Sequence, residues 1–262
     1  MSDEERLPFT SHLEELRRRL IVCLIATGIG FVASYAFKEK LFDILRMPML
    51  SIMPKGDTFI FTGVAEAFFT YLKVSLIAGI LFASPVIIYQ LWMFVAPGLY
   101  LKEKRLLMPL IILSGFFFVA GSLFGYFFVF PTGFKFFQGY ANDTIRFMPS
   151  VSQYLSFASK MLLAFGVVFE LPIVLVGLSR IGVVTVSFLN KNRKYAILLI
   201  FIAAAILTPG PDVFSQLMMA LPLMFLYEIS ILGAFIFGKK KKEEENDEDQ
   251  MEIAVKEKPE NQ

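Results

Sequence analysis

The sequence predicts an all-α polytopic membrane protein with six transmembrane helices and both termini in the cytoplasm. Its composition is the first reason: 56% of the 262 residues are hydrophobic, 18% are charged, and the mean hydropathy is +0.64. A water-soluble domain of this size carries more charge and less apolar surface. The spacing of the apolar segments and the placement of Lys and Arg between them are the other two reasons. The net charge of +2 gives no indication of nucleic-acid binding.

Six apolar segments are long enough, or nearly long enough, to cross a hydrocarbon layer. They lie at about 20–37, 68–94, 106–130, 160–179, 195–207 and 213–237. None shows the alternation of a strand, so all are expected to be helical. An even number of spans places both termini on the same side of the membrane. We expect residues 1–238 to form one membrane domain.

Basic residues set the expected orientation. They gather on the side of the membrane that holds both termini: Arg6, Arg17, Arg18, Arg19, Lys102, Lys104, Arg105, Arg180, Lys191, Arg193, Lys194 and the lysines at 239–242. Because positively charged connections stay in the cytoplasm, this side is predicted to be cytoplasmic. Residues 239–262 (KKKKEEENDEDQ and beyond) have many charges and no apolar face, which predicts a disordered cytoplasmic tail.

The fifth span is unusually short. From Arg193 to Thr208 the chain reaches only roughly 22 Å as a helix, less than the hydrocarbon thickness. The residues at 208–212 (TPGPD) interrupt the helix, and Asp212 is a candidate N-cap for the last one. Two interpretations stay open: a hairpin that ends below the outer surface, or a thinned bilayer beside it.

The outer connections at 38–67 and 131–159 are long and rich in Phe, Pro and Met. Such apolar connections predict short helices that lie on the membrane or pack as a cap.

Glu170 lies in the middle of the fourth span, ten residues from both Lys160 and Arg180. A carboxylate near the bilayer midplane is costly and normally faces protein or water. Pro172 removes the helical donor to the Val168 carbonyl, which predicts a bend beside the glutamate. Glu170 is then either a group that lines a cavity or a protonated, hydrogen-bonded member of the bundle. Two other charged residues within spans have structural interpretations: Lys73 extends to the outer surface, and Glu228 forms an interhelical hydrogen bond.

The first helix is expected to start at Ser11, with Glu14 completing a capping box and Glu15 paired with Arg19 one turn later. In the first cytoplasmic connection, Glu103 is the only carboxylate among cations and apolar side chains. It either forms a local salt bridge or accepts a guanidinium from a partner.

No catalytic arrangement or metal-ligand spacing is present, and the chain has one Cys (Cys23) and one His (His12). The sequence therefore predicts no enzyme, no metal and no cofactor. A rival hypothesis is an ion-coupled small-molecule transporter with Glu170 as proton carrier, against which the absence of internal repeats counts.

Four blocks of the sequence resemble the TatC family, the core subunit of the twin-arginine protein translocase. They are residues 12–19 (HLEELRRR), 94–105 (FVAPGLYLKEKR), 165–172 (FGVVFELP) and 208–216 (TPGPDVFSQ), in the family's order. The resemblance implies a glove-shaped six-helix bundle in the cytoplasmic (inner) membrane of a prokaryote. It also implies a receptor for signal peptides with two consecutive arginines. Folded proteins would be exported with the proton-motive force as energy source. The implied partners are single-span subunits of the TatA or TatB type, the lipid bilayer and further copies of the chain.

The resemblance also implies residue roles. The expected signal-peptide site consists of Glu15, Arg17, Arg19, Phe94, Leu99 and Glu103, with the two glutamates as contacts for the arginine pair. Glu170 corresponds to the family's intramembrane glutamate on the concave side, and Pro48 to a proline of the outer cap. Docking of a single-span partner is expected at Thr208, Asp212 and Gln216.

Overall fold

The computed structural model describes residues 7–53, 59–60, 62–95, 107–141, 148–207 and 213–238. Within these ranges every named element is a helix, apart from one isolated parallel bridge between Ile60 and Ser150. The predicted all-helical class is confirmed. In chain order the elements are α1 (Leu7–Ala36), α2 (Lys38–Leu50), α3 (Glu66–Val95), α4 (Leu107–Phe124), the π-helix η4 (Gly125–Val129), α5 (Phe130–Gln138), α6 (Val151–Val168), α7 (Leu171–Arg180), α8 (Val186–Lys191), α9 (Arg193–Leu207) and α10 (Val213–Phe237).

Five helical segments of the described chain are long and apolar enough to cross a membrane. They are Ser11–Ala36, Glu66–Phe94, Leu107–Gln138, Val151–Arg180 and Val213–Phe237. Helices predominate because apolar surroundings leave each backbone group no partner except another backbone group. The predicted range 195–207 falls in α9, which has 15 residues and is therefore about 22 Å long.

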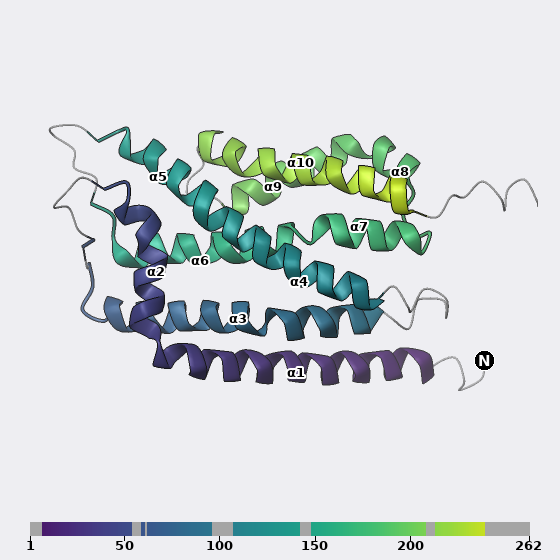
Figure 1. Ribbon diagram of the computed structural model, residues 1–262, viewed down its shortest axis with the longest axis horizontal. Coiled ribbons are helices and arrows are strands. Elements are labelled where there is room, and N and C mark those ends of the chain that lie inside the picture. Colours follow the sequence, from purple (N-terminus) through teal and green to yellow (C-terminus); the bar gives the residue numbers. More distant parts are fainter. Residues whose placement is uncertain are drawn as a thin grey trace, which may run out of the picture.

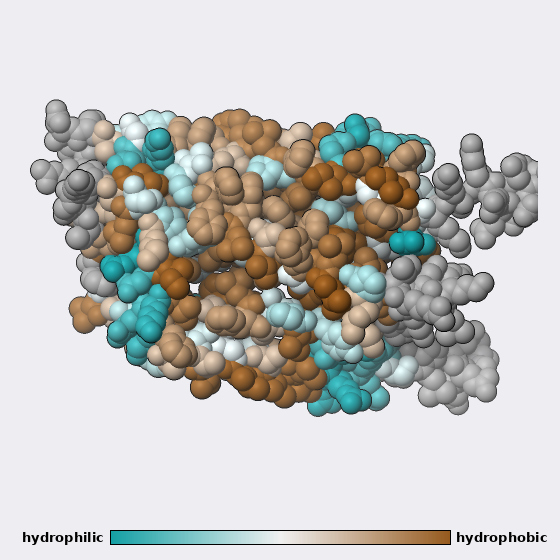
Figure 2. Space-filling model, viewed as in Figure 1, coloured by the Kyte–Doolittle hydropathy of each residue, from teal (hydrophilic) through white to brown (hydrophobic). Residues whose placement is uncertain are grey.

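The long helices run side by side, and α1 begins at the same end of the molecule at which α10 ends (Figure 1). α2 and α5 lie at the opposite end. Hydrophobic side chains cover the middle of the face shown in Figure 2, whereas hydrophilic ones gather toward the two ends. This banding is the pattern expected of a protein surrounded by lipid.

One predicted boundary was wrong. α1 starts before Ser11, at Leu7, so Ser11 lies inside the helix and does not cap it. The outer connections contain short helices, as predicted: α2 lies in the first, and α5 and the start of α6 lie in the second. The tail at 239–262 and the break at 208–212 lie outside the described residues.

α1 and α3 pack along each other at very close range. Gly30 faces Gly79, and a Cβ on Gly30 would lie 2.6 Å from the Gly79 carbonyl oxygen. Buried Ser34 and Ser75 continue the line of small side chains on the two helices. Small residues let helix backbones approach closely in a membrane, where packing drives association.

Glu66, the first residue of α3, links α3 to the start of α6 by hydrogen bonds. Its carboxylate accepts hydrogen bonds from the Ser150 hydroxyl at 2.8 Å and from the Ser152 backbone N–H at 2.7 Å. The backbone N–H of Gly63 donates to the same carboxylate at 3.0 Å. The Glu66 carboxylate thus accepts hydrogen bonds from the start of α6, while Glu66 itself begins α3. These bonds join two segments that are far apart in the sequence.

The predicted bend beside Glu170 is present as a break between α6 and α7. The Glu170 N–H bonds the Val167 carbonyl, three residues back, at 3.1 Å. Pro172 is the second residue of α7, a position where its missing N–H is tolerated. The break leaves Glu170 between two helices that pack separately against α4 and α10.

We expect Gly79→Ala to lower the stability of the protein by about 1–3 kcal/mol, because the added methyl group overlaps the backbone of Phe31 and forces α1 away from α3. The measurement is thermal unfolding of the purified protein in detergent. Gly115→Ala is the matched control, since a Cβ there meets no atom within 4 Å. Equal melting temperatures for the two variants would contradict the close packing.

Candidate functional site

One candidate site lies where α1 starts and α3 ends. His12, Glu15 and Arg19 are spaced by three and four residues, so they lie on one face of α1. That face meets the last turns of α3, where Gln90 and Phe94 are also four residues apart. Residues 96–106, which carry Leu99 and Glu103, follow directly and lie outside the described residues.

Arg19 joins the two helices. Its Nε donates to Glu15 Oε1 at 3.0 Å, and its Nη2 approaches the same oxygen. Its Nη1 donates to Gln90 Oε1, also at 3.0 Å. The predicted Glu15–Arg19 pair is therefore present, and Gln90 fixes it against α3.

His12 lies on the other side of the Glu15 carboxylate. Its ring stacks on Phe94 with centroids 4.2 Å apart and an interplanar angle of 17°. His12 Nδ1 lies 3.9 Å from Glu15 Oε2, too far for a hydrogen bond. Both arginine contacts fall on Oε1, and within the described part of the chain Oε2 accepts no hydrogen bond. Glu15 is half-buried, with 30% of its side chain exposed.

Arg17 lies apart from this group. It is exposed and lines a shallow hollow of about 310 Å³ on another face of α1, with Glu14, Arg18, Ile21 and Val22. The structure thus brings together Glu15, Arg19 and Phe94 among the predicted signal-peptide residues. It places Arg17 on the adjacent surface.

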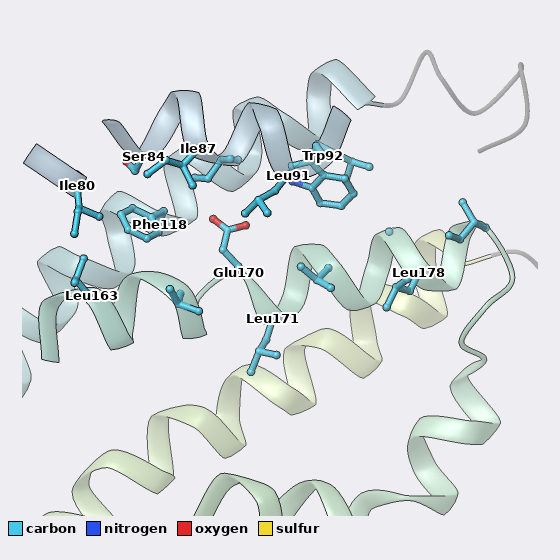
Figure 3. Close-up of a pocket in the computed structure, with 16 residues that line it drawn as sticks. Ile80, Ser84, Ile87, Leu91, Trp92, Phe118, Leu163, Glu170, Leu171 and Leu178 are labelled. Carbon is cyan, nitrogen blue, oxygen red and sulfur yellow. The ribbon is translucent and has the colours of Figure 1, made fainter. Parts of the chain in front are cut away.

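The second candidate site is a cavity of about 560 Å³ around Glu170. α3, α4, α6 and α7 line it almost entirely with apolar side chains, and Glu170 is its one charged residue. Its carboxyl group points from the break between α6 and α7 toward Ile87 and Leu91 of α3 (Figure 3). An acidic group at this depth therefore faces a space within the protein.

A hydrogen bond joins α3 and α4 beside the cavity. Trp92, which lines the cavity, donates from Nε1 to Ser114 Oγ at 2.9 Å. Ser114 is completely buried. Glu170 Oε1 is buried as well and has no hydrogen-bond partner among the described residues.

Pro48 is buried in α2, where its ring nitrogen cannot donate to the Ile44 carbonyl one turn back. The Tyr126 hydroxyl donates to that carbonyl instead, at 2.6 Å. Tyr154 donates to the neighbouring Leu45 carbonyl, also at 2.6 Å. Pro48 therefore leaves a carbonyl of α2 free to accept a hydrogen bond from a side chain of a neighbouring helix.

The remaining predicted residues lie near α9 and α10. Gln216 Nε2 donates to the Phe201 carbonyl at 3.0 Å and links the two helices. Thr208 and Asp212 lie outside the described residues. Glu228 forms an ion pair with Arg193 of α9 at 2.6 Å, consistent with the interhelical interaction expected for it. Lys73 donates to Ser156 at 3.1 Å on the exposed side of α3.

Sequence reasoning missed Gln90, Trp92, Ser114 and Tyr126 as members of these sites. Each lies in a helix whose own pattern gives no indication of its partner, because the partner comes from another helix. The sequence offered one local signal for these sites: Trp92 and Phe94 lie shortly before the Pro-Gly pair at 97–98. In the described residues no group of three His, Cys, Asp or Glu side chains is placed to hold a metal ion.

A helical chain with five apolar helices long enough to span a bilayer is a multi-pass membrane protein. The family profile of the Sec-independent protein translocase protein (TatC) matches residues 11–222. The chain belongs to the TatC family, a family of transport proteins rather than enzymes.

Relatives support this assignment over nearly the full length. TatC of Desulforapulum autotrophicum is 63% identical over 239 residues, which are 91% of this chain and 88% of the relative. TatC of Escherichia coli K12 is 38% identical over 240 residues, 91% of this chain and 93% of the relative. A crystal structure of the twin-arginine translocase receptor TatC superimposes with a TM-score of 0.78 at 43% identity, covering 86% of this chain and 98% of that one.

We expect Tyr126→Phe to destabilise the protein by about 1–2 kcal/mol, because it leaves the Ile44 carbonyl without a donor beside Pro48. Unfolding of the purified protein in detergent measures the change. Tyr140→Phe removes a hydroxyl from a side chain that is 67% exposed and serves as control. An unfolding midpoint equal to that of the control variant would refute the role of Tyr126.

Proposed function

We propose that this protein is the signal-peptide receptor and core subunit of a twin-arginine translocase, which exports folded proteins across the cytoplasmic membrane. The observation that carries the proposal is the half-buried Glu15, whose Oε1 is engaged by Arg19 and whose Oε2 accepts no hydrogen bond from the described residues. Membership of the TatC family supports it.

The expected orientation belongs to the same proposal. α1 begins at the end of the molecule where α10 finishes, and Arg17, Arg18 and Arg19 lie in the first half of α1 (Figure 1). Positive charge at this end favours the cytoplasm. In this arrangement α9 acts as a sixth, short crossing of a glove-shaped bundle, and both termini are cytoplasmic.

The arginine pair of a signal peptide binds at the end of α1 and α3. Glu15 supplies one carboxylate, and Glu103 in the adjacent connection supplies the second. Phe94, held by its stacking on His12, and Leu99 form the apolar side of the site. Arg17 and Arg19 shape its rim. A guanidinium bridges two acceptors in a plane, whereas a lysine presents a single point charge, so the site selects arginine.

The apolar core of the signal peptide then enters the membrane beside the bundle. The cavity at Glu170 opens between α3 and α7 and presents aliphatic side chains suited to an apolar helix. Glu170 meets a polar group of the signal peptide or of a partner subunit there. Burial of the apolar face of the signal peptide contributes affinity. The single polar contact with Glu170 fixes the position of the peptide along the cavity.

Single-span subunits of the TatA or TatB type dock at the hairpin of α9 and α10, near Thr208, Asp212 and Gln216. The shortness of α9 supports a locally thinned bilayer at this edge. One chain of this size is too small to surround a folded protein, so transport requires partners and further copies of this chain. By analogy with the TatC family, the proton-motive force supplies the energy. Pro48 keeps the outer cap rigid through the contacts of α2.

We expect Glu15→Gln to weaken binding of an arginine-pair signal peptide by on the order of tenfold, since one charge-assisted hydrogen bond is lost. Binding of a labelled signal peptide to the purified receptor complex measures the effect. Glu14→Gln is the control, because Glu14 faces the shallow hollow on the other side of α1. A lysine-pair peptide should bind weakly to all variants. Equal binding of arginine and lysine peptides would refute the receptor proposal.

We expect Glu170→Ala to leave folding intact and to impair export. The substitution removes a buried carboxyl group with an unpartnered oxygen, which relieves desolvation rather than breaking a core contact. Export of a folded fluorescent reporter is measured together with the amount of protein in the membrane. Glu228→Gln, at the exposed pair with Arg193, is the control. Loss of the Glu170→Ala protein from the membrane would show that Glu170 is structural.

A further inference from the structure

The guanidinium group of Arg19 is held by side chains from two helices. Glu15 and Arg19 lie on α1, whereas Gln90 lies near the end of α3. Arg19 Nε donates to Glu15 Oε1 at 3.0 Å, and Arg19 Nη1 donates to Gln90 Oε1, also at 3.0 Å. Only 18% of the Arg19 side chain is exposed. Because a guanidinium group is planar and rigid, these two contacts together fix its orientation.

The packing of α1 on α3 places Gln90 opposite Arg19. The two helices run in opposite directions (Figure 1). Arg19 lies eleven residues before Gly30 on α1, and Gln90 lies eleven residues after Gly79 on α3. Eleven residues make about three helical turns, so each of the two polar residues shares a helix face with its glycine. The close contact of Gly30 with Gly79 therefore also determines which α3 residue meets Arg19.

Arg19 contacts only one of the two Glu15 carboxylate oxygens. The edge of a guanidinium group that carries Nε and Nη2 matches a carboxylate best when each nitrogen donates to a different oxygen. Here Nε donates to Oε1 and Nη2 approaches the same oxygen. In the described part of the chain Oε2 accepts no hydrogen bond, and His12 Nδ1 is 3.9 Å from it. Glu15 thus keeps one oxygen that Arg19 does not use, on a side chain that is 30% exposed.

The contact with Gln90 accounts for this one-oxygen arrangement. The Gln90 amide oxygen accepts from Nη1 and so keeps the Arg19 guanidinium group from turning to place Nε and Nη2 on both oxygens of Glu15. Without that acceptor, the two-oxygen arrangement is the favoured one within α1. An arginine that enters from outside would then have to displace Arg19 from Oε2.

We propose that Gln90 is a positioning residue of the signal-peptide site, which holds Arg19 on Glu15 Oε1 and leaves Oε2 to accept a hydrogen bond from an arginine of the peptide. The inference rests on the proposed receptor function and deepens it. Gln90 does not touch the peptide and acts through Arg19. The site is thereby set before the peptide arrives, which reduces the side-chain ordering that binding requires.

The test uses three variants of α3 in the full-length protein. Gln90→Leu removes the acceptor and keeps a side chain of similar size, whereas Gln90→Glu keeps an acceptor at the same place. Tyr89→Phe is the matched control, because it removes a hydroxyl group from the neighbouring residue, which is 41% exposed. Binding of a labelled arginine-pair signal peptide to the purified receptor complex is measured. Thermal unfolding in detergent is measured on the same samples.

We expect Gln90→Leu to weaken peptide binding several-fold, with an unfolding midpoint close to that of Tyr89→Phe. Gln90→Glu should bind the peptide at least as tightly as the unchanged protein. In an Arg19→Gln background, Gln90→Leu should cause no further loss, because the group that Gln90 positions is absent. A further loss in that background, or equal losses in Gln90→Leu and Gln90→Glu, would overturn the positioning role.

The two proposals fail differently. If Glu15→Gln binds the arginine-pair peptide as tightly as the unchanged protein does, the receptor role of Glu15 is wrong, and the role of Gln90 is wrong with it. If Glu15→Gln weakens binding while Gln90→Leu matches Tyr89→Phe, the role of Glu15 stands and the positioning role of Gln90 is wrong.

Discussion

The structure depends on one constraint: a backbone group that loses its helical partner inside a membrane needs another one. Proline creates this situation repeatedly in the chain. Pro48 frees the Ile44 carbonyl, which accepts from Tyr126, and Pro85 frees the Leu81 carbonyl, which accepts from Ser84 at 2.7 Å. Before Pro131 the helix widens into the π-helix η4 instead. Each interruption is thus repaired by a side chain or by a local change of helical geometry.

The repairs produce features that a continuous helix would lack. At Pro172 the chain breaks into α6 and α7, and Glu170 lies at the gap with its carboxyl group directed at α3. Glu170 is thereby the charged residue in the otherwise apolar lining that α3, α4, α6 and α7 provide among the described residues. A carboxyl group among apolar side chains is expensive unless it faces protein or water.

The same reasoning connects the two candidate sites. α3 contributes Gln90 and Phe94 to the site at the end of α1, and Ile87, Leu91 and Trp92 to the cavity. These residues lie within two turns of one helix, so the Glu15 site and the cavity are neighbours along α3. The close contact of Gly30 with Gly79 keeps α1 and α3 in fixed register. In the proposed receptor role, the first site reads charge and the cavity reads apolar shape.

The sequence by itself determined the helical class, the apolar segments, the bend at Pro172 and the i,i+4 pair of Glu15 with Arg19. All of these follow from local rules of composition, length and spacing along one helix. The tertiary structure alone decided that Arg19 also binds Gln90, that Tyr126 donates to the free Ile44 carbonyl of α2, and that Trp92 donates to Ser114. It also showed that α1 begins before Ser11 and that Arg17 lies on the adjacent face. The reason is physical: helices of nearly uniform apolar composition carry no pattern that selects a partner, so which faces meet is decided by packing between helices.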